Sequence, residues 1–215
     1  MLWRNGSFCA NIFFMTATSA APDILAQIKQ SAADNAVPIM QDSGMEFILN
    51  YIKQNRVRRI LEIGTGIGYS AIKFALSSPD IRVFTIEADI DRYHEAVKNF
   101  SDENLGERVT CFLGDAATFS FKEKFDLIFI DGPKAQYINF FERYKDNLAD
   151  GGAIISDNLS FHGMVEDISL THNYSTKKLI KKIRKYIQFL KDNKEFKTEF
   201  YSAGDGISVS KRADA

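Results

Sequence analysis

The sequence predicts an α/β fold with a mostly parallel seven-stranded sheet, helices on both faces and a C-terminal antiparallel hairpin. Three observations lead to this prediction. Short apolar runs alternate five times with amphipathic helical segments, the pattern of a doubly wound sheet. The first of these runs ends in a glycine-rich turn at residues 64–68 (GTGIG). The last two runs flank residues 204–206 (GDG), which are typical of a hairpin turn.

Each element follows from its own pattern of apolar residues. Side chains that recur at helical spacing predict helices over residues 22–35, 42–54, 70–76, 91–99, 137–148 and 176–191. Short apolar runs predict strands over residues 59–63, 81–86, 108–113, 125–130, 153–156, 196–201 and 207–210. Pro38 separates the first two helices, and no repeat or linker divides the chain further.

The composition is that of a folded protein without a membrane span. Hydrophobic residues make up 45% of the 215 positions, enough for a substantial core, and 26% are charged. No apolar run reaches the roughly 18 residues that a transmembrane helix needs, so no membrane partner is expected. Cys9 and Cys111 are too few for a disulfide framework and too isolated for a zinc site. Such cysteine usage favours a reducing, cytoplasmic location.

The first twenty residues are expected to lie outside the domain. Residues 1–20 are interpreted as an extension that is poorly ordered or comes from an upstream start, with Met15 as the alternative initiator. A secretory signal is the other interpretation, because Arg4 precedes a short apolar stretch. Asn11 interrupts that stretch, which disfavours a signal peptide. The domain is predicted over residues 21–215.

Charge is distributed unevenly along the chain. The net charge is −1, but residues 177–197 contain nine Lys or Arg and two Asp or Glu, a local balance of +7. The remaining residues therefore carry −8. The basic segment predicts a positive patch that attracts phosphate, although a solvated amphipathic helix would have the same composition.

Acidic residues follow the predicted parallel strands. They stand at or just beyond the ends of five successive runs, as Glu62, Glu87, Asp115, Asp131 and Asp157. Ligands of open parallel sheets bind outside the carboxyl ends of the strands, so this edge is the candidate site. Strand ends also attract polar residues by default, which makes the joint occurrence more informative than any single position.

The glycine turn favours a nucleoside cofactor other than NAD. Its spacing is G-x-G-x-G, whereas the dinucleotide fingerprint is G-x-G-x-x-G. An ordinary tight turn would explain the glycines alone. Glu87 changes the interpretation, because a carboxylate at the end of the second strand can accept hydrogen bonds from both ribose hydroxyls. Asp115 and Ala116 would then face the adenine edge.

Three segments carry a resemblance to a known family. Residues 61–70 (LEIGTGIGYS), residues 125–131 (FDLIFID) with Lys134 and Tyr137, and residues 155–158 (ISDN) resemble motifs of S-adenosylmethionine-dependent O-methyltransferases of the catechol and caffeoyl-CoA type. The resemblance extends over residues 38–211. It implies a single Rossmann-like class I methyltransferase domain and an enzyme that methylates a hydroxyl oxygen.

The resemblance also implies a set of site residues. S-adenosylmethionine would be bound by Met40, Glu62, Gly64, Gly66, Ser70, Glu87, Asp115, Ala116 and Asp131. A divalent cation, Mg²⁺ or Mn²⁺, would be held by Asp131, Asp157 and Asn158, oxygen donors that suit a hard ion. Asp131 and Lys134 would be catalytic, with Lys134 stabilising the acceptor oxyanion or taking its proton. The alternatives are a turn cap at Asp131, an Asx turn at residues 157–158 and a solvated charge at Lys134.

Two features of the sequence bear on the acceptor. Catechol-type members carry an acidic residue three positions before the Asp-Gly of the last hairpin, where this chain has Ser202. The segment after Asn158 and the basic helix are more similar to bacterial tRNA 5-hydroxyuridine methyltransferases, which implies tRNA as substrate. A small catechol-like or phenolic metabolite is the alternative. A non-catalytic RNA-binding module and a nucleotide-binding oxidoreductase are further alternatives, and the resemblance implies a homodimer.

Overall fold

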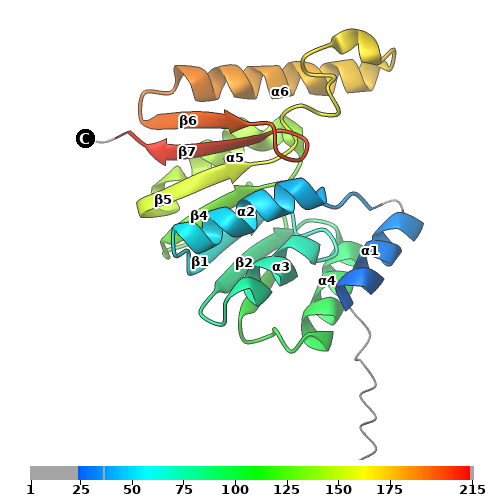
Figure 1. Ribbon diagram of the computed structural model, residues 1–215, viewed down its shortest axis with the longest axis vertical. Helices are drawn as coiled ribbons and strands as arrows, with labels where there is room; N and C mark the ends of the chain where they lie inside the picture. Colours follow the sequence, from blue (N-terminus) through cyan, green and yellow to red (C-terminus); the bar gives the residue numbers. More distant parts are fainter. Residues whose placement is uncertain (1–23, 36, 214–215) are drawn as a thin grey trace, which may run out of the picture.

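Residues 24–35 and 37–213 are described by the computed structural model, in which they form one α/β domain (Figure 1). The sheet is built from β1 (Arg59–Ile63), β2 (Arg82–Glu87), β3 (Val109–Leu113), β4 (Phe125–Ile130), β5 (Leu148–Ser156), β6 (Phe196–Tyr201) and β7 (Ile207–Arg212). Its strand order is β3-β2-β1-β4-β5-β7-β6. Strands β1 to β5 pair in parallel, whereas β7 is antiparallel to both β5 and β6. The predicted fold class is confirmed.

Helices cover both faces of the sheet (Figure 1). They are α1 (Ile24–Asp34), α2 (Asp42–Gln54), α3 (Tyr69–Ser77), α4 (Ile90–Asp102), α5 (Tyr137–Tyr144) and α6 (Tyr174–Asp192), with short 3₁₀ turns at η1 (Lys134–Gln136), η2 (Lys145–Asn147) and η3 (Ile168–Leu170). Successive strand residues point to opposite faces. Ile60 accordingly packs in the core with α1 to α4, and Leu61 packs in the core with α5 and α6.

The chain reverses direction across the sheet next to β1. It runs outward from β1 to β2 and β3, and then crosses to β4 on the other side of β1. This arrangement places a topological switch point between β1 and β4, where ligands of doubly wound sheets bind beyond the strand ends. The strand order alone therefore indicates where the site lies.

The fifth predicted helix was too long, and the strand after it too short. Helix α5 ends at Tyr144 rather than at residue 148, and β5 begins at Leu148 rather than at residue 153. Asn147 stops the helix, because its side chain donates hydrogen bonds to the backbone oxygens of Phe121 and Glu123 at 2.8 and 2.9 Å. Leu148 is then buried opposite Phe125 on β4.

The other described elements lie close to their predicted bounds. The structure reproduces helix 42–54 and strands 59–63, 125–130 and 196–201 to the residue, and α4 and β7 run two or three residues further than expected. The extension over residues 1–20 and the start of the first helix lie outside the described residues. Among the helices of the described part, none is both long and apolar enough to cross a membrane.

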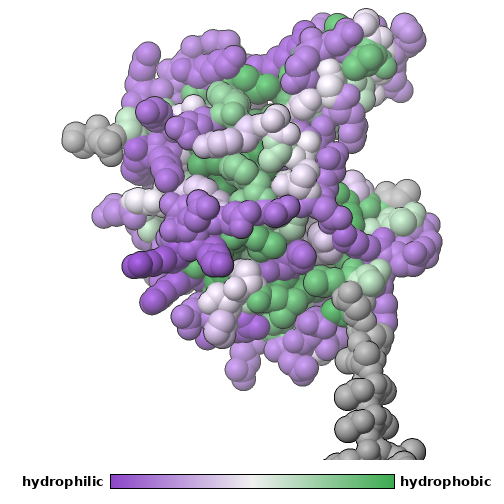
Figure 2. Space-filling view, viewed as in Figure 1, coloured by the Kyte–Doolittle hydropathy of each residue, from purple (hydrophilic) through white to green (hydrophobic). Residues whose placement is uncertain are grey.

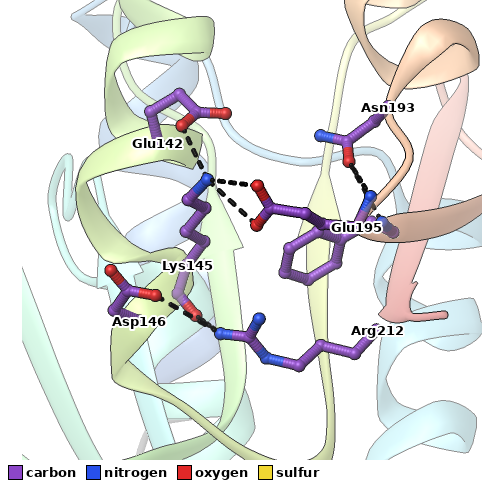
Figure 3. A network of polar contacts seen from close by, with 7 residues as sticks. Glu142, Lys145, Asp146, Asn193, Glu195 and Arg212 are labelled. Atoms are coloured by element: carbon purple, nitrogen blue, oxygen red, sulfur yellow. Dashed lines mark hydrogen bonds and ion pairs between the residues drawn. The ribbon is translucent and has the colours of Figure 1, made fainter. Parts of the chain in front are cut away.

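A network of polar contacts joins elements at the amino-terminal edge of the parallel strands, away from their carboxyl ends (Figure 3). Lys145 lies 2.9 Å from a carboxylate oxygen of Glu142 and 3.0 Å from Glu195, which precedes β6. Arg212 at the end of β7 lies 3.5 Å from Asp146 and donates a hydrogen bond to the Lys145 backbone oxygen at 2.8 Å. These contacts tie the end of α5 to the C-terminal hairpin.

Candidate active site

A cavity of about 750 Å³ opens at the carboxyl ends of the parallel strands. Its volume lies within the range of small-molecule and cofactor sites. The structure brings all but one of the twelve expected site residues to its wall. Those that line it are Met40, Gly64, Gly66, Ser70, Glu87, Asp115, Ala116, Asp131, Lys134, Asp157 and Asn158.

Glycine occupies two positions of the turn after β1 for different structural reasons. Gly64 has φ +99°, and a Cβ there would lie 2.5 Å from the backbone oxygen of Asp131. Only glycine therefore lets β1 and the loop after β4 approach this closely. Gly66 has φ +56°, and a Cβ there would meet nothing within 4 Å. Its backbone lines the cavity, where a ligand can approach without an intervening side chain.

Glu87 at the end of β2 fixes that glycine turn. One carboxylate oxygen accepts a hydrogen bond from the Gly66 N–H at 2.7 Å, and the other accepts from the Asp89 N–H at 2.9 Å. The side chain is only 7% exposed, yet it lines the cavity. Glu87 thus presents a carboxylate to a ligand beside a fixed backbone, as recognition of a ribose requires.

Glu62 is the one expected cofactor-binding residue that does not line the cavity. It is fully buried, and its carboxylate accepts hydrogen bonds from the Ser70 hydroxyl and, at 2.6 Å, from the Thr85 hydroxyl. Burial raises the pKa of Glu62 to about 8. The side chain joins β1 to β2 and to the start of α3, so it supports the turn that lines the cavity.

Two carboxylates at the ends of β4 and β5 face the same part of the cavity. Asp131 lies 3.8 Å from the ammonium of Lys134, and burial nevertheless raises the pKa of Asp131 to about 6. Burial and the nearby Asp131 raise the pKa of Asp157 to about 7. The Oδ1 atom of Asp157 is buried and has no hydrogen-bond partner. An unpaired buried carboxylate oxygen is costly unless a positive group faces it.

The donor set fits a hard divalent cation. In the described part of the chain, no three His, Cys, Asp or Glu side chains are grouped so that they could hold a metal by themselves. The expected set differs in kind, because it has two carboxylates and the amide oxygen of Asn158. Asn158 has φ +60°, an uncommon left-handed conformation for a residue other than glycine. Oxygen donors with the unpaired Asp157 Oδ1 among them are the chemistry that Mg²⁺ and Mn²⁺ prefer.

Asp205 is a site-supporting residue that the sequence did not reveal. It lies in the turn between β6 and β7, and its Oδ1 accepts a hydrogen bond from the His162 N–H at 2.6 Å. Its backbone oxygen accepts from Ser160, and that of Gly206 accepts from Leu159, at 2.8 and 2.9 Å. The hairpin turn therefore holds the loop that follows Asn158. In the sequence, an Asp between two glycines had indicated only the turn.

Tyr137 is a second support that sequence reasoning left without a role of its own. Its hydroxyl donates a hydrogen bond to the backbone oxygen of Asp157 at 3.2 Å, and its ring packs edge-on against Tyr186 of α6. The side chain is 1% exposed. Tyr137 therefore connects the end of β5 to both helices on that face, and its place one turn after Lys134 was the available signal.

The remaining expected residues surround the glycine turn. Asp115 accepts a hydrogen bond from the Ala117 N–H at 2.8 Å, which fixes the turn after β3, and Ala116 beside it is buried. Met40 reaches the cavity from the segment before α2 and is 6% exposed. Ala116 and Met40 thus contribute apolar surface to the cavity, and Asp115 contributes a carboxylate. Such a surface suits the base of a nucleoside.

Known proteins share this fold and this arrangement of motifs. Residues 15–213 match the family model described as O-methyltransferase. A solved structure from Staphylococcus aureus, whose name proposes a caffeoyl-CoA O-methyltransferase, is 33% identical, covers 88% of this chain and 92% of its own, and has a TM-score of 0.84. The O-methyltransferase from Bacillus cereus, solved with S-adenosylhomocysteine (SAH), is 25% identical, covers 92% of this chain and 94% of its own, and has a TM-score of 0.75. The caffeoyl-CoA O-methyltransferase of Petroselinum crispum is 22% identical over 213 residues, which cover 89% of this chain and 84% of that protein.

The family match spans the whole described domain and ends one residue beyond β7. The resemblance that the motifs carried in the sequence is therefore confirmed at the level of the family, and so is the enzyme class. The motif residues stand at the carboxyl ends of β1, β2, β4 and β5, around one cavity. The chain belongs to the O-methyltransferase family, as an S-adenosylmethionine-dependent enzyme.

Proposed function

We propose that the protein transfers a methyl group from S-adenosylmethionine to the 5-hydroxyl of 5-hydroxyuridine at the wobble position of tRNA, with a divalent cation bound in the site. The observation that carries the choice of acceptor is the contrast between an acidic cavity and the unpaired basic face of α6 beside it. A tRNA acceptor accords with the cytoplasmic location that the cysteine usage favours.

The cofactor part of the proposal rests on the glycine turn and Glu87. The Gly66 backbone and the Glu87 carboxylate lie together at the cavity wall, where they would bind the ribose, and Asp115 and Ala116 would contact the base. S-adenosylmethionine supplies the methyl group as an electrophilic sulfonium. SAH bound in the Bacillus cereus relative supports the assignment.

The metal part rests on Asp131, Asp157 and Asn158. These residues would hold Mg²⁺ or Mn²⁺, which when bound lowers the pKa of a hydroxyl on the acceptor. An acceptor with two neighbouring oxygens suits such a site, and 5-hydroxyuridine has a carbonyl next to its hydroxyl. Lys134, 3.8 Å from Asp131 at the cavity wall, would stabilise the acceptor oxyanion or take its proton.

The RNA part rests on α6. Among the described residues, none of the lysines at positions 177, 178, 181, 182 and 185 forms an ion pair with a carboxylate, and the last four of them are exposed. Figure 2 shows hydrophilic side chains along the outer side of α6, at the top of the molecule. Lys178 also lies 4.5 Å from the ring centroid of Tyr174, which is 71% exposed. Exposed cations beside an exposed aromatic ring favour a nucleic acid.

A small catechol-like metabolite is the second candidate acceptor. The caffeoyl-CoA name of the Petroselinum relative favours it, and the cavity is large enough for a phenol beside the cofactor. Ser202 disfavours it, because it supplies no carboxylate to orient a phenol. The family match removes the support for the other two alternatives, a non-catalytic RNA-binding module and a nucleotide-binding oxidoreductase.

Replacing the three exposed lysines 178, 181 and 182 by Ala tests the acceptor. We expect weaker binding of tRNA and a flatter salt dependence, because each lost phosphate contact lowers the slope of log affinity against log salt by about 0.7–0.9. The measurement is filter binding across salt concentrations, with methylation of tRNA and of a catechol panel in parallel.

The matched control replaces three exposed lysines elsewhere, Lys53, Lys122 and Lys211, and removes the same charge. Its tRNA affinity should stay near that of the unsubstituted protein. Equal losses in both triple variants would mean that α6 is only a solvated face. Methylation of catechols without any methylation of tRNA would establish the small-molecule acceptor instead.

A further inference from the structure

A second cavity, of about 690 Å³, lies behind the loop that follows Asn158. We call it the hairpin cavity, because β6, the β6–β7 turn and the start of β7 form one side of it and the second half of α6 forms the other. The residues that matter here are Leu159, Ser160, Arg184, Lys191, Phe200 and Gly204. Nothing in the reaction proposed above uses this space.

The hairpin cavity shares a wall with the active site. Asn158 lines the active-site cavity, and the next two residues, Leu159 and Ser160, line the hairpin cavity. Gly204 lines it as well, and a Cβ there would lie only 4.0 Å from the unpaired Oδ1 of Asp157. An acceptor whose reactive group lies next to Asp157 would therefore have its neighbouring parts beside this second cavity.

Cationic and aromatic side chains meet on the walls of the hairpin cavity. Phe200 is 41% exposed, and the Lys191 ammonium lies 5.8 Å from its ring centroid. Arg184 donates two hydrogen bonds to the Val165 backbone oxygen, at 2.8 and 2.6 Å, which fix its guanidinium in the wall. In the described part of the chain, neither Lys191 nor Arg184 forms an ion pair.

One acidic side chain also reaches this cavity. Glu166 lines it, and its carboxylate accepts a hydrogen bond from the Ser160 hydroxyl at 2.9 Å. The two cations outnumber this carboxylate, so an anion is favoured over a cation. A ring open to stacking next to a cation is how proteins hold a base together with its phosphate, and the volume is sufficient for one nucleotide.

We propose that the hairpin cavity binds the nucleotide next to the one that is methylated, with its base on Phe200 and its phosphate at Lys191. This inference rests on the proposed function, since it assumes an RNA acceptor. The enzyme would then recognise two adjacent nucleotides of its RNA acceptor. The acceptor would then be positioned by its neighbour as well as by the cation site.

A direct RNA-binding assay tests the inference and does not depend on methylation. The probe is a short fluorescein-labelled oligouridylate, titrated with the full-length protein and followed by anisotropy. Replacing Phe200 by Ala should weaken binding about tenfold, because one stacked base is lost. Lys191→Ala should weaken it by a similar factor and lower the salt slope by about 0.7.

Two matched control variants distinguish RNA binding in the hairpin cavity from nonspecific attraction of RNA to the protein surface. Lys53→Ala removes the same charge from an exposed helical position outside both cavities and away from α6, and Leu170→Ala removes an exposed apolar side chain elsewhere. Both should bind the probe like the unsubstituted protein. Equal losses for Lys53→Ala and Lys191→Ala, absence of binding, or tighter binding of coenzyme A than of the oligouridylate would each overturn the proposal. Methylation of tRNA by the unsubstituted protein is scored separately, so a failure of the cavity and a failure of the proposed function are distinguishable.

Discussion

At the scale of single residues, burial decides what the acidic side chains at the strand ends can do. Glu62 is fully buried with two hydroxyl donors, Glu87 is nearly buried with two backbone donors, and Asp157 retains an oxygen with no partner. Acidic side chains at equivalent strand ends therefore differ in role: Glu62 supports the fold, whereas Glu87 and Asp157 are the proposed cofactor and metal contacts. The sequence shows the residue type and the position but does not show the number of donors around it.

Glu62 is expected to make stability depend on pH. Its pKa is raised from 4.5 to about 8 in the fold, so the folded state binds more protons than the unfolded state between these values. The free energy of unfolding should fall as pH rises through this window and should level off above it. Glu62→Gln removes the titration, and the curve of its unfolding free energy against pH should be flatter.

Chemical denaturation at a series of pH values measures this difference. Glu46→Gln, at an exposed position of α2, is the control and should follow the unsubstituted protein. A Glu62→Gln curve parallel to that of the unsubstituted protein between pH 5 and 9, a window that brackets the expected titration, would mean that Glu62 titrates alike in the folded and unfolded states.

Glu87→Ala should weaken S-adenosylmethionine binding by about 1.5–3 kcal/mol, because the ribose hydroxyls lose a charged acceptor. Isothermal titration calorimetry on the folded variant measures the change. Asp89→Ala is a matched control, since Asp89 is a nearby carboxylate that caps α4 and does not line the cavity. Unchanged affinity in Glu87→Ala would remove this residue from the cofactor site.

At the scale of elements, the hairpin turn and the loop after β5 act together. Three hydrogen bonds join them: from the N–H groups of Leu159 and Ser160 to backbone oxygens of the turn, and from the His162 N–H to the Asp205 carboxylate. His162 and Phe161 both have positive φ. Residues in such conformations persist only where their surroundings hold them, and here the hairpin does so.

Asp205→Ala should therefore raise the Mg²⁺ concentration needed for half-maximal methylation about tenfold or more, the usual effect of removing a group that orients a metal ligand. The affinity for S-adenosylmethionine should not change, because Asp205 does not line that cavity. Asp205→Asn keeps a side-chain oxygen for the His162 N–H and should recover most of the loss. If Asp205→Ala has a normal Mg²⁺ requirement, the loop does not depend on the turn.

The elements themselves were largely predictable because apolar periodicity is a local property. Four of them match to the residue, and α5 with β5 is the main departure. That boundary depends on Asn147, whose side chain contacts the loop before β4, more than twenty residues earlier in the chain. A contact between distant segments leaves no local pattern, so the sequence could not show where the helix ends.

At the scale of the whole molecule, the order of strands explains why the candidate site was predictable and its supports were not. Parallel strands end at one edge, so residues at strand ends meet there whatever the details of the fold. The expected residues at or just beyond the strand ends, apart from Glu62, line the cavity as a result. Asp205 reaches the same place from an antiparallel hairpin, whose position beside β5 is a property of the complete sheet.

The molecule carries acidic and basic residues on two different parts of its surface. The carboxyl edge of the sheet is acidic, and α6 with its surroundings carries +7 over residues 177–197. A phosphate backbone would be attracted to the basic face while the cation site neutralises the acidic one. A homodimer, which the family resemblance implies, stays a prediction that analytical ultracentrifugation tests.

Mass spectrometry of tRNA nucleosides decides whether the enzyme methylates a tRNA hydroxyl in a cation-dependent reaction. Bulk tRNA that lacks the modification is incubated with the protein, S-adenosylmethionine and Mg²⁺, digested to nucleosides and examined by mass spectrometry for 5-methoxyuridine. We predict that the methylated nucleoside forms, disappears with excess chelator and returns on addition of Mg²⁺ or Mn²⁺. Asp157→Ala should abolish it while the binding of S-adenosylmethionine persists. Full methylation in excess chelator, or by Asp157→Ala, would mean that no cation held by Asp157 takes part in the reaction.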